Sequence, residues 1–140
     1  MSEVKINAAL VTAYRAALPA LSSATAYEGM GFTPTIGSKW GQVFNLRAAA
    51  DVASLGVGGQ DDHTGVFQID VNVPENSGTA ALLADADTLR AYFVVGRAFT
   101  YQSQSVRVRR ADVSPIRRVD GWLRVSVSVT YSAYTTRPEI

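Results

Sequence analysis

The stretch from Gly65 to Gly96 constrains the fold of this chain most, because a clear strand pattern is followed by a clear helix pattern. Residues 65–73 alternate between an apolar and a mostly polar face, which predicts a half-buried β-strand ended by Pro74. Residues 78–94 then place apolar side chains at helical spacing, and Gly96 predicts the end of that helix. The apolar faces consist of Phe67, Ile69, Val71 and Val73 in the strand, and of Leu82, Leu83, Ala86, Leu89 and Phe93 in the helix.

Weaker patterns extend this unit to the rest of the chain. An apolar stripe at helical spacing predicts a helix over residues 2–18 that ends before Pro19. Strands are expected at residues 24–28, 42–50, 104–111 and 121–134, with 57–64 as a polar, mobile loop and 112–120 as a connection. Runs of strands with few helices predict an α+β fold: a mostly antiparallel sheet with two main helices packed on one face, in a single domain over residues 1–140.

Composition narrows the functional classes. The 140 residues include no cysteine, which excludes disulfide frameworks, thiol catalysis and cysteine-ligated metals. The formal net charge of +1 does not provide the general basic field of a nucleic-acid-binding chain. The N-terminal residues do not form a signal peptide, and no stretch reaches the ~18 apolar residues of a membrane span. We therefore expect a soluble protein without membrane contact.

Candidate chemistry is sparse in this sequence. His63 is the only histidine, and with Asp61 and Asp62 beside it in a flexible loop it does not make a preorganised metal site; we expect an exposed loop histidine. No Gly-x-Ser-x-Gly motif occurs, and the glycines of residues 56–59 precede no Lys-Ser/Thr pair. The sequence predicts no enzyme activity, no cofactor and no metal site.

An arginine cluster in the last third of the chain is the most distinctive polar feature. It could bind an acidic protein surface, it could be a solvated sheet face partly neutralised by Asp112 and Asp120, or it could bind nucleic acid. These three interpretations stay open, and the small polar side chains Ser126, Ser128 and Thr130 suggest that another layer could approach the same region closely. The cluster consists of Arg107, Arg109, Arg110, Arg117, Arg118 and Arg124.

Several segments together resemble the phage tail terminator-like proteins, which are head–tail completion subunits of long-tailed bacteriophages. The resemblance covers nearly the whole chain, from the N-terminal helix to Tyr134, and depends on the order and spacing of its parts. Those parts are Pro34, Leu55-Gly56, residues 65–71, Pro74 to Gly78, Leu83-Ala84-Asp85, Phe93 to Gly96, Trp122 and the alternating strand to Tyr131.

The resemblance implies a structural role in a siphovirus-like virion. Such subunits form a hexameric ring that caps the tail tube, ends its polymerisation and offers a docking surface to the head connector or stopper protein. The ring would lie at the head-proximal end of the tail after assembly in the host cytoplasm, with DNA passing through its lumen without sequence-specific contact. The resemblance also implies an α+β fold and transfers no catalytic residue to this chain.

A closed ring needs two different contact surfaces on each subunit. Charge suggests Asp61, Asp62 and His63 for one surface and the arginine cluster for the other, so these residues are the predicted subunit or partner interface. The alternative function is a small α+β nucleic-acid-binding module that uses the arginine cluster.

Overall fold

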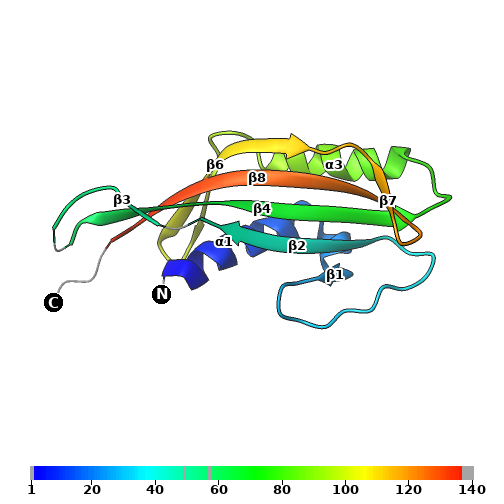
Figure 1. Cartoon of the computed structure of the whole chain (residues 1–140), viewed down its shortest axis with the longest axis horizontal. Helices are drawn as coiled ribbons and strands as arrows, with labels where there is room; N and C mark the ends of the chain where they lie inside the picture. The colour runs from blue at the N-terminus through cyan, green and yellow to red at the C-terminus, as the bar shows by residue number, and fades with distance from the viewer. Residues whose placement is uncertain (1, 49, 57, 137–140) are drawn as a thin grey trace.

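The chain forms a curled eight-stranded sheet and three helices, in a computed structural model that describes residues 2–48, 50–56 and 58–136 (Figure 1). The helices are α1 (Ser2–Ala17), α2 (Pro19–Ser22) and α3 (Ala80–Tyr92). The strands are β1 (Thr25–Ala26), β2 (Trp40–Arg47), β3 (Asp51–Val52), β4 (Gln60–Pro74), β5 (Ala98–Tyr101), β6 (Gln104–Val113), β7 (Arg117–Val119) and β8 (Trp122–Thr136).

A long antiparallel ladder between β4 and β8 forms the centre of the sheet. It runs from the Gln60–Thr136 pair to the Pro74–Trp122 pair. The strand order is β1-β2-β4-β8-β6-β5, with β3 beside one end of β4 and β7 beside the other end of β8. The pair of β1 with β2 is parallel, and the remaining pairs are antiparallel.

The predicted fold class, an α+β fold with a mostly antiparallel sheet and two main helices on one face, is wrong. Strands make up 45% of the structure and helices 24%, so the chain is mostly β. The sheet is mixed because β1 runs parallel to β2, and the short α2 is a third helix. The sequence did not indicate this because β3, β5 and β7 are only two to four residues long, too short to show an alternating pattern. The strand expected at residues 24–28 is present as β1, but its parallel pairing with β2 has no local signal.

Single elements can be compared with their predictions. The helices expected at 2–18 and 78–94 are confirmed as α1 and α3, and the strands expected at 65–73 and 104–111 lie within β4 and β6. The strand expected at 121–134 corresponds to β8, which begins one residue later and ends at Thr136. The strand expected at 42–50 begins earlier, at Trp40, and ends at Arg47. The loop expected at 57–64 is wrong for residues 60–64, which extend β4, and β7 interrupts the connection expected at 112–120. Val57 itself lies outside the described residues.

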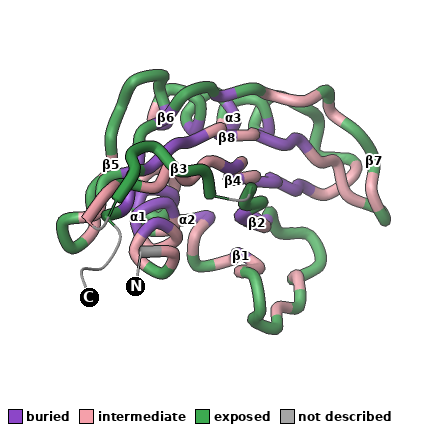
Figure 2. The backbone as a smooth tube through the Cα atoms, turned by 60° about the vertical axis from the view of Figure 1, so that its left-hand side comes forward, coloured by how far each residue is buried: buried purple, intermediate pink, exposed green. Residues whose placement is uncertain are grey.

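The core lies between the inner, concave face of the sheet and the helices α1 and α3 (Figure 2). Helix α1 contacts β5 and β6, whereas α3 contacts β4 and β8, so the curl of the sheet encloses both helices. Alternate residues of the two central strands face this core. The buried apolar side chains include Ile6, Leu10, Tyr14, Phe67, Ile69, Val71, Leu82, Leu89, Phe93, Val125, Val127, Val129 and Tyr131.

Two glycines in the strands allow the side chains of Tyr14 and Tyr131 to approach the backbone of the sheet closely. A Cβ at Gly41 would lie 2.5 Å from the Tyr14 hydroxyl, and a Cβ at Gly65 would lie 2.7 Å from the Tyr131 hydroxyl. The Tyr14 hydroxyl is hydrogen-bonded to Thr25 Oγ1 at 2.7 Å. These positions need glycine because only the absence of a side chain makes room for the rings.

Tyr14 gives a first prediction, which concerns alkaline pH. Burial raises the pKa of Tyr14 from 10.0 to about 12. Below pH 10 the phenol is protonated in both the folded and the unfolded chain, so it adds no pH dependence. Between pH 10 and pH 12 only the unfolded chain releases the proton, so the free energy of unfolding should fall by on the order of 3 kcal/mol.

The measurement is urea unfolding at pH 9, 10, 11 and 12 for the wild type and for Tyr14→Phe. The variant should show a flatter decline between pH 10 and pH 12, although it starts from a lower stability because the contact with Thr25 is lost. Tyr134→Phe, a change at a half-exposed ring, is the matched control. Equal declines in the wild type and in Tyr14→Phe would contradict the assignment.

Candidate functional site

The outer face of the sheet, opposite α1 and α3, carries mostly polar side chains. Because directly paired residues in a sheet point to the same side, the register of β4 with β8 defines this face. It is a band of hydroxyl, amide and carboxylate side chains flanked by arginines. Its central residues are Gln68, Asp70, Asn72, Ser126, Ser128, Thr130 and Ser132.

A β-bulge in β6 gathers three arginines on the outer face. Arg107 pairs with Ser132 and Arg110 pairs with Thr130, and the register shifts between them. Arg109 is the extra residue at this register shift and has no register partner in β8. Its Nε donates to Ser132 Oγ at 2.6 Å. Regular alternation would place Arg109 and Arg110 on opposite faces, so the extra residue of the bulge turns both outward.

A groove of about 460 Å³ opens beside these arginines, between the start of β6 and the end of β8. Arg107 and Arg109 both line it, and Arg107 Nη1 donates to the Gly96 carbonyl at 2.9 Å. Within the described part of the chain neither guanidinium forms an ion pair. Each is held by one hydrogen bond and keeps other N–H groups for an acidic partner.

Arg117 and Arg124 form a second group at the other end of the outer face, where they pair directly across β7 and β8. Arg124 Nε donates to Asn72 Oδ1 at 2.7 Å, and Arg117 Nη2 donates to Ser126 Oγ at 2.8 Å. The Ser126 hydroxyl in turn donates to Asp70 Oδ1 at 2.6 Å. The carboxylate of Asp70 is buried, so this chain of contacts links a buried negative charge to a surface arginine.

The other two predicted arginines have local acidic partners. Arg110 Nε lies 2.6 Å from Asp112 Oδ2, and Arg118 Nη1 lies 2.8 Å from Glu75 Oε1. Both arginine side chains are more than 70% exposed, so these pairs add little stability and mainly neutralise charge. The structure therefore separates the predicted cluster into Arg107 with Arg109, Arg117 with Arg124, and two locally neutralised arginines.

Asp61, Asp62 and His63 lie in β4 and not in a mobile loop. Asp62 pairs with Asp51 of β3 and with Tyr134 of β8, and His63 pairs with Ala133. The prediction of a loop failed because consecutive polar residues hide the period of two in this part of β4. Pairing with β3 and β8 on both sides fixes Asp61 and Asp62 in the end of the sheet, and pairing with β8 fixes His63.

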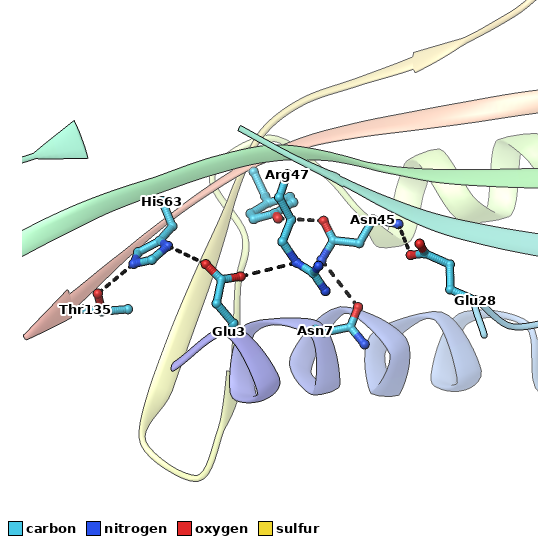
Figure 3. Close-up of polar contacts among 8 residues, drawn as sticks. Glu3, Asn7, Glu28, Asn45, Arg47, His63 and Thr135 are labelled. Carbon is cyan, nitrogen blue, oxygen red and sulfur yellow. Dashed lines mark hydrogen bonds and ion pairs between the residues drawn. The ribbon is translucent and has the colours of Figure 1, made fainter. Parts of the chain in front are cut away.

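The prediction of an exposed loop histidine is also wrong. Only 14% of the His63 side chain is exposed. Its Nδ1 lies 2.9 Å from Glu3 Oε1, and its Nε2 lies 2.7 Å from Thr135 Oγ1 (Figure 3). With the proton on Nδ1, His63 donates to Glu3 and accepts from Thr135, so both ring nitrogens are used in tying α1 to β4 and β8.

This polar cluster continues along α1 to residues that sequence reasoning missed. Asn45 Nδ2 donates to Asn7 Oδ1 at 3.3 Å (Figure 3). The Tyr131 hydroxyl donates to Asn45 Oδ1 at 2.7 Å. Burial raises the pKa of Tyr131 above its ordinary value. Glu3 also pairs with Arg47, Nε to Oε2 at 3.2 Å. No sequence motif marks this cluster, because its members come from α1, β2, β4 and β8.

In the described ranges 2–48, 50–56 and 58–136, no three histidine, aspartate or glutamate side chains converge as a cation site would need. The helices of the same ranges include none with the length and apolarity to cross a membrane.

Comparisons with known proteins identify the family. The sequence profile of a family described as phage tail terminator protein matches residues 5–131. One solved structure, whose printed name states no function, is 26% identical, covers 99% of both chains and has a TM-score of 0.76. Another, from the virion of a native gene transfer agent particle, is 19% identical, covers 94% of this chain and 97% of that one, and has a TM-score of 0.52, so it shows a shared fold.

Curated protein sequences gave no significant match. The family profile nevertheless spans the sheet from β1 to β8 together with most of α1 and all of α3. Its extent confirms the resemblance found in the sequence. This chain belongs to the phage tail terminator protein family and is a structural protein of a virion tail.

Proposed function

We propose that this protein is a ring subunit that caps the finished tail tube at its head-proximal end. Six copies would close the ring, stop tube polymerisation and present a docking surface to the head connector or stopper protein. DNA would pass through the lumen without sequence-specific contact, and assembly would take place in the host cytoplasm. Membership of the tail terminator family is the observation that carries this proposal.

The outer face of the sheet offers a rigid contact surface for such a ring. Its side chains are short or tied by hydrogen bonds, so a neighbouring subunit could approach closely with little loss of side-chain freedom. The groove with Arg107 and Arg109 would accept carboxylates of that neighbour or of the tube. Asp61, Asp62 and His63 lie at the same end of the sheet, so we propose that they border this contact and do not form a separate opposite surface.

A tube-capping assay tests the function directly. Tail tube protein polymerised alone should give tubes of indefinite length, and added terminator subunits should yield short tubes that each carry a ring at one end in negative-stain images. If the added protein changes neither the tube length nor the tube ends, the proposal is wrong. Binding to DNA with a steep salt dependence, in place of capping, would support the nucleic-acid module instead.

Reversing the charge of Arg109 is the second prediction. Arg109→Glu places a carboxylate where an acidic partner is expected, so ring association should weaken at least about tenfold, or roughly 1.4 kcal/mol. Light scattering of ring mass against concentration measures this effect. Arg90→Glu, on the exposed side of α3, is the matched control and should leave the ring mass unchanged. Unchanged ring mass in Arg109→Glu would refute the contact.

A further inference from the structure

A small pocket with both apolar and polar lining lies between α1 and the edge of β2. Its volume is about 210 Å³. Val43 and Phe67, both core residues, line it together with Val11 of α1 and with Met30. Asn7, Arg15 and Glu28 add polar groups to the lining. The apolar part of the lining and the small size suit a single aliphatic side chain.

The edge of β2 beside this pocket is only partly covered. Strand β1 pairs with Gly41 and Gln42, and the rest of β2 as far as Arg47 has its ladder on the β4 side. The backbone N–H of Asn45 points to the open side and donates to the carboxylate of Glu28, a side chain in the place of a neighbouring strand. An open edge next to an apolar pocket is the usual setting in which an extended segment of a partner docks.

An arm at the far end of the sheet carries unusually exposed apolar side chains. We define the arm as β3 with the ends of β4 and β8, residues 60–64 and 133–136, where neither β2 nor β6 accompanies the central ladder (Figure 1). Leu55, in the connection between β3 and β4, is 90% exposed, and Val52 is also exposed. An isolated leucine at the end of a projecting arm is a candidate anchor for an interface.

We propose that Leu55 of one copy inserts into the pocket between α1 and β2 of the next copy. This inference rests on the proposed ring, because arm and pocket are two different surfaces and would join copies head to tail. Charge supports the match: Asp51 and Asp62 lie in the arm, whereas Arg15 lines the pocket. Glu28 lines the pocket as well, but its carboxylate already accepts the backbone N–H of Asn45. In the described residues Arg15 has no ion pair and its guanidinium lies 5.1 Å from the centre of the Tyr27 ring.

Ile36 is the main competitor for the pocket, since it is 95% exposed. It lies in the loop between β1 and β2, near Lys39 and without a neighbouring carboxylate in the sequence. Residues 29–39 around Ile36 contain no carboxylate that could pair with Arg15, and Lys39 already pairs with Asp85 at 3.1 Å, so this loop offers no attractive charge to the pocket. The acidic arm with Leu55 is therefore the better occupant.

The absence of cysteine from the sequence permits a clean cross-linking test. Leu55→Cys and Met30→Cys would be made as separate variants, one with a tag that changes its mass, and mixed under conditions in which rings or capped tubes form. Oxidation should give a disulfide-linked heterodimer between the two variants. Leu55→Cys mixed with Val95→Cys, an exposed position after α3, is the matched control and should cross-link far less.

A second measurement avoids cysteine chemistry. Leu55→Ser should weaken ring association by about tenfold without changing thermal stability, because the side chain is exposed in the single subunit. Ile36→Ser should leave association unchanged. If rings form but the Leu55 and Met30 variants cross-link no more than the control, the insertion is wrong and the ring proposal stands. If the wild type forms neither rings nor caps, the proposed function fails and this inference fails with it.

Discussion

Replacing Gly65 with alanine should lower the free energy of unfolding by about 3 kcal/mol, because overpacking a well-packed core strains its neighbours. The new Cβ would lie 2.7 Å from the Tyr131 hydroxyl, 2.8 Å from the backbone oxygen of Leu46 and 2.9 Å from Tyr131 Cζ. The Leu46 oxygen belongs to the backbone of β2 and cannot rotate away. Tyr131 is 2% exposed and bound to Asn45, so it cannot yield either.

Urea unfolding followed by tryptophan fluorescence measures this loss, since Trp40 and Trp122 contact each other edge to face across the sheet. Gly31→Ala is the matched control. A Cβ there would meet no atom within 4 Å, so the free energy of unfolding should change by less than about 0.5 kcal/mol. A Gly65→Ala protein as stable as Gly31→Ala would show that the tyrosine does not cross the strand as closely as described.

Among the substitutions measured at constant pH, removal of the Ser126 hydroxyl should have the next largest effect on stability. Ser126→Ala should lower the free energy of unfolding by about 2 kcal/mol, because a buried charged group loses a hydrogen bond. In the described structure the Asp70 carboxylate would keep Gln68 Nε2, at 3.0 Å, as its donor. Arg117 would lose its contact with Ser126, so the arginine should become more mobile.

The same denaturation assay, applied to a double-mutant cycle, tests the cause. Combining Ser126→Ala with Asp70→Asn should cost less than the sum of the single changes, since the amide removes the buried charge. Ser128→Ala is the matched control: it lies on the same face of β8 and is partly exposed. Additive losses in the cycle would mean that Ser126 does not act through Asp70.

Predictions of helices and strands from the sequence were most accurate where a single hydrophobic periodicity continued over many residues. Residues 65–73 and 121–134 alternate over a long stretch, and both were placed in strands that form the centre of the sheet. Residues 2–18 and 78–94 keep helical spacing and were likewise confirmed. Patterns of this length reflect the burial of one face against the core, which is a local property of the chain.

The fold class and the short strands could not be predicted in this way. β3 and β7 have two and three residues, and their existence depends on pairing with β4 and β8, which the sequence order does not reveal. The parallel pairing of β1 with β2, which makes the sheet mixed, is equally non-local. Tertiary pairing, not local propensity, decides such elements.

The sequence indicated which residues belong to the candidate site but not how they are arranged in space. The bulge at Arg109 turns three arginines to one face, and a bulge has no clear signature in a run such as residues 106–110. His63 was misjudged because its partners Glu3 and Thr135 lie at the two ends of the sequence. Only the fold brings these groups together.

The ladder between β4 and β8 also affects how the protein folds. β4 cannot pair with β8 until α3, β5, β6 and β7, which lie between them in the chain, have been synthesised. Closing so long a loop is slow, so folding should take on the order of milliseconds to seconds, compared with microseconds for a chain of local contacts. During synthesis the apolar face of β4 is exposed before β8 is available, so the unfinished chain is prone to aggregation. A subunit therefore becomes competent for virion assembly only after its last strand has joined the sheet.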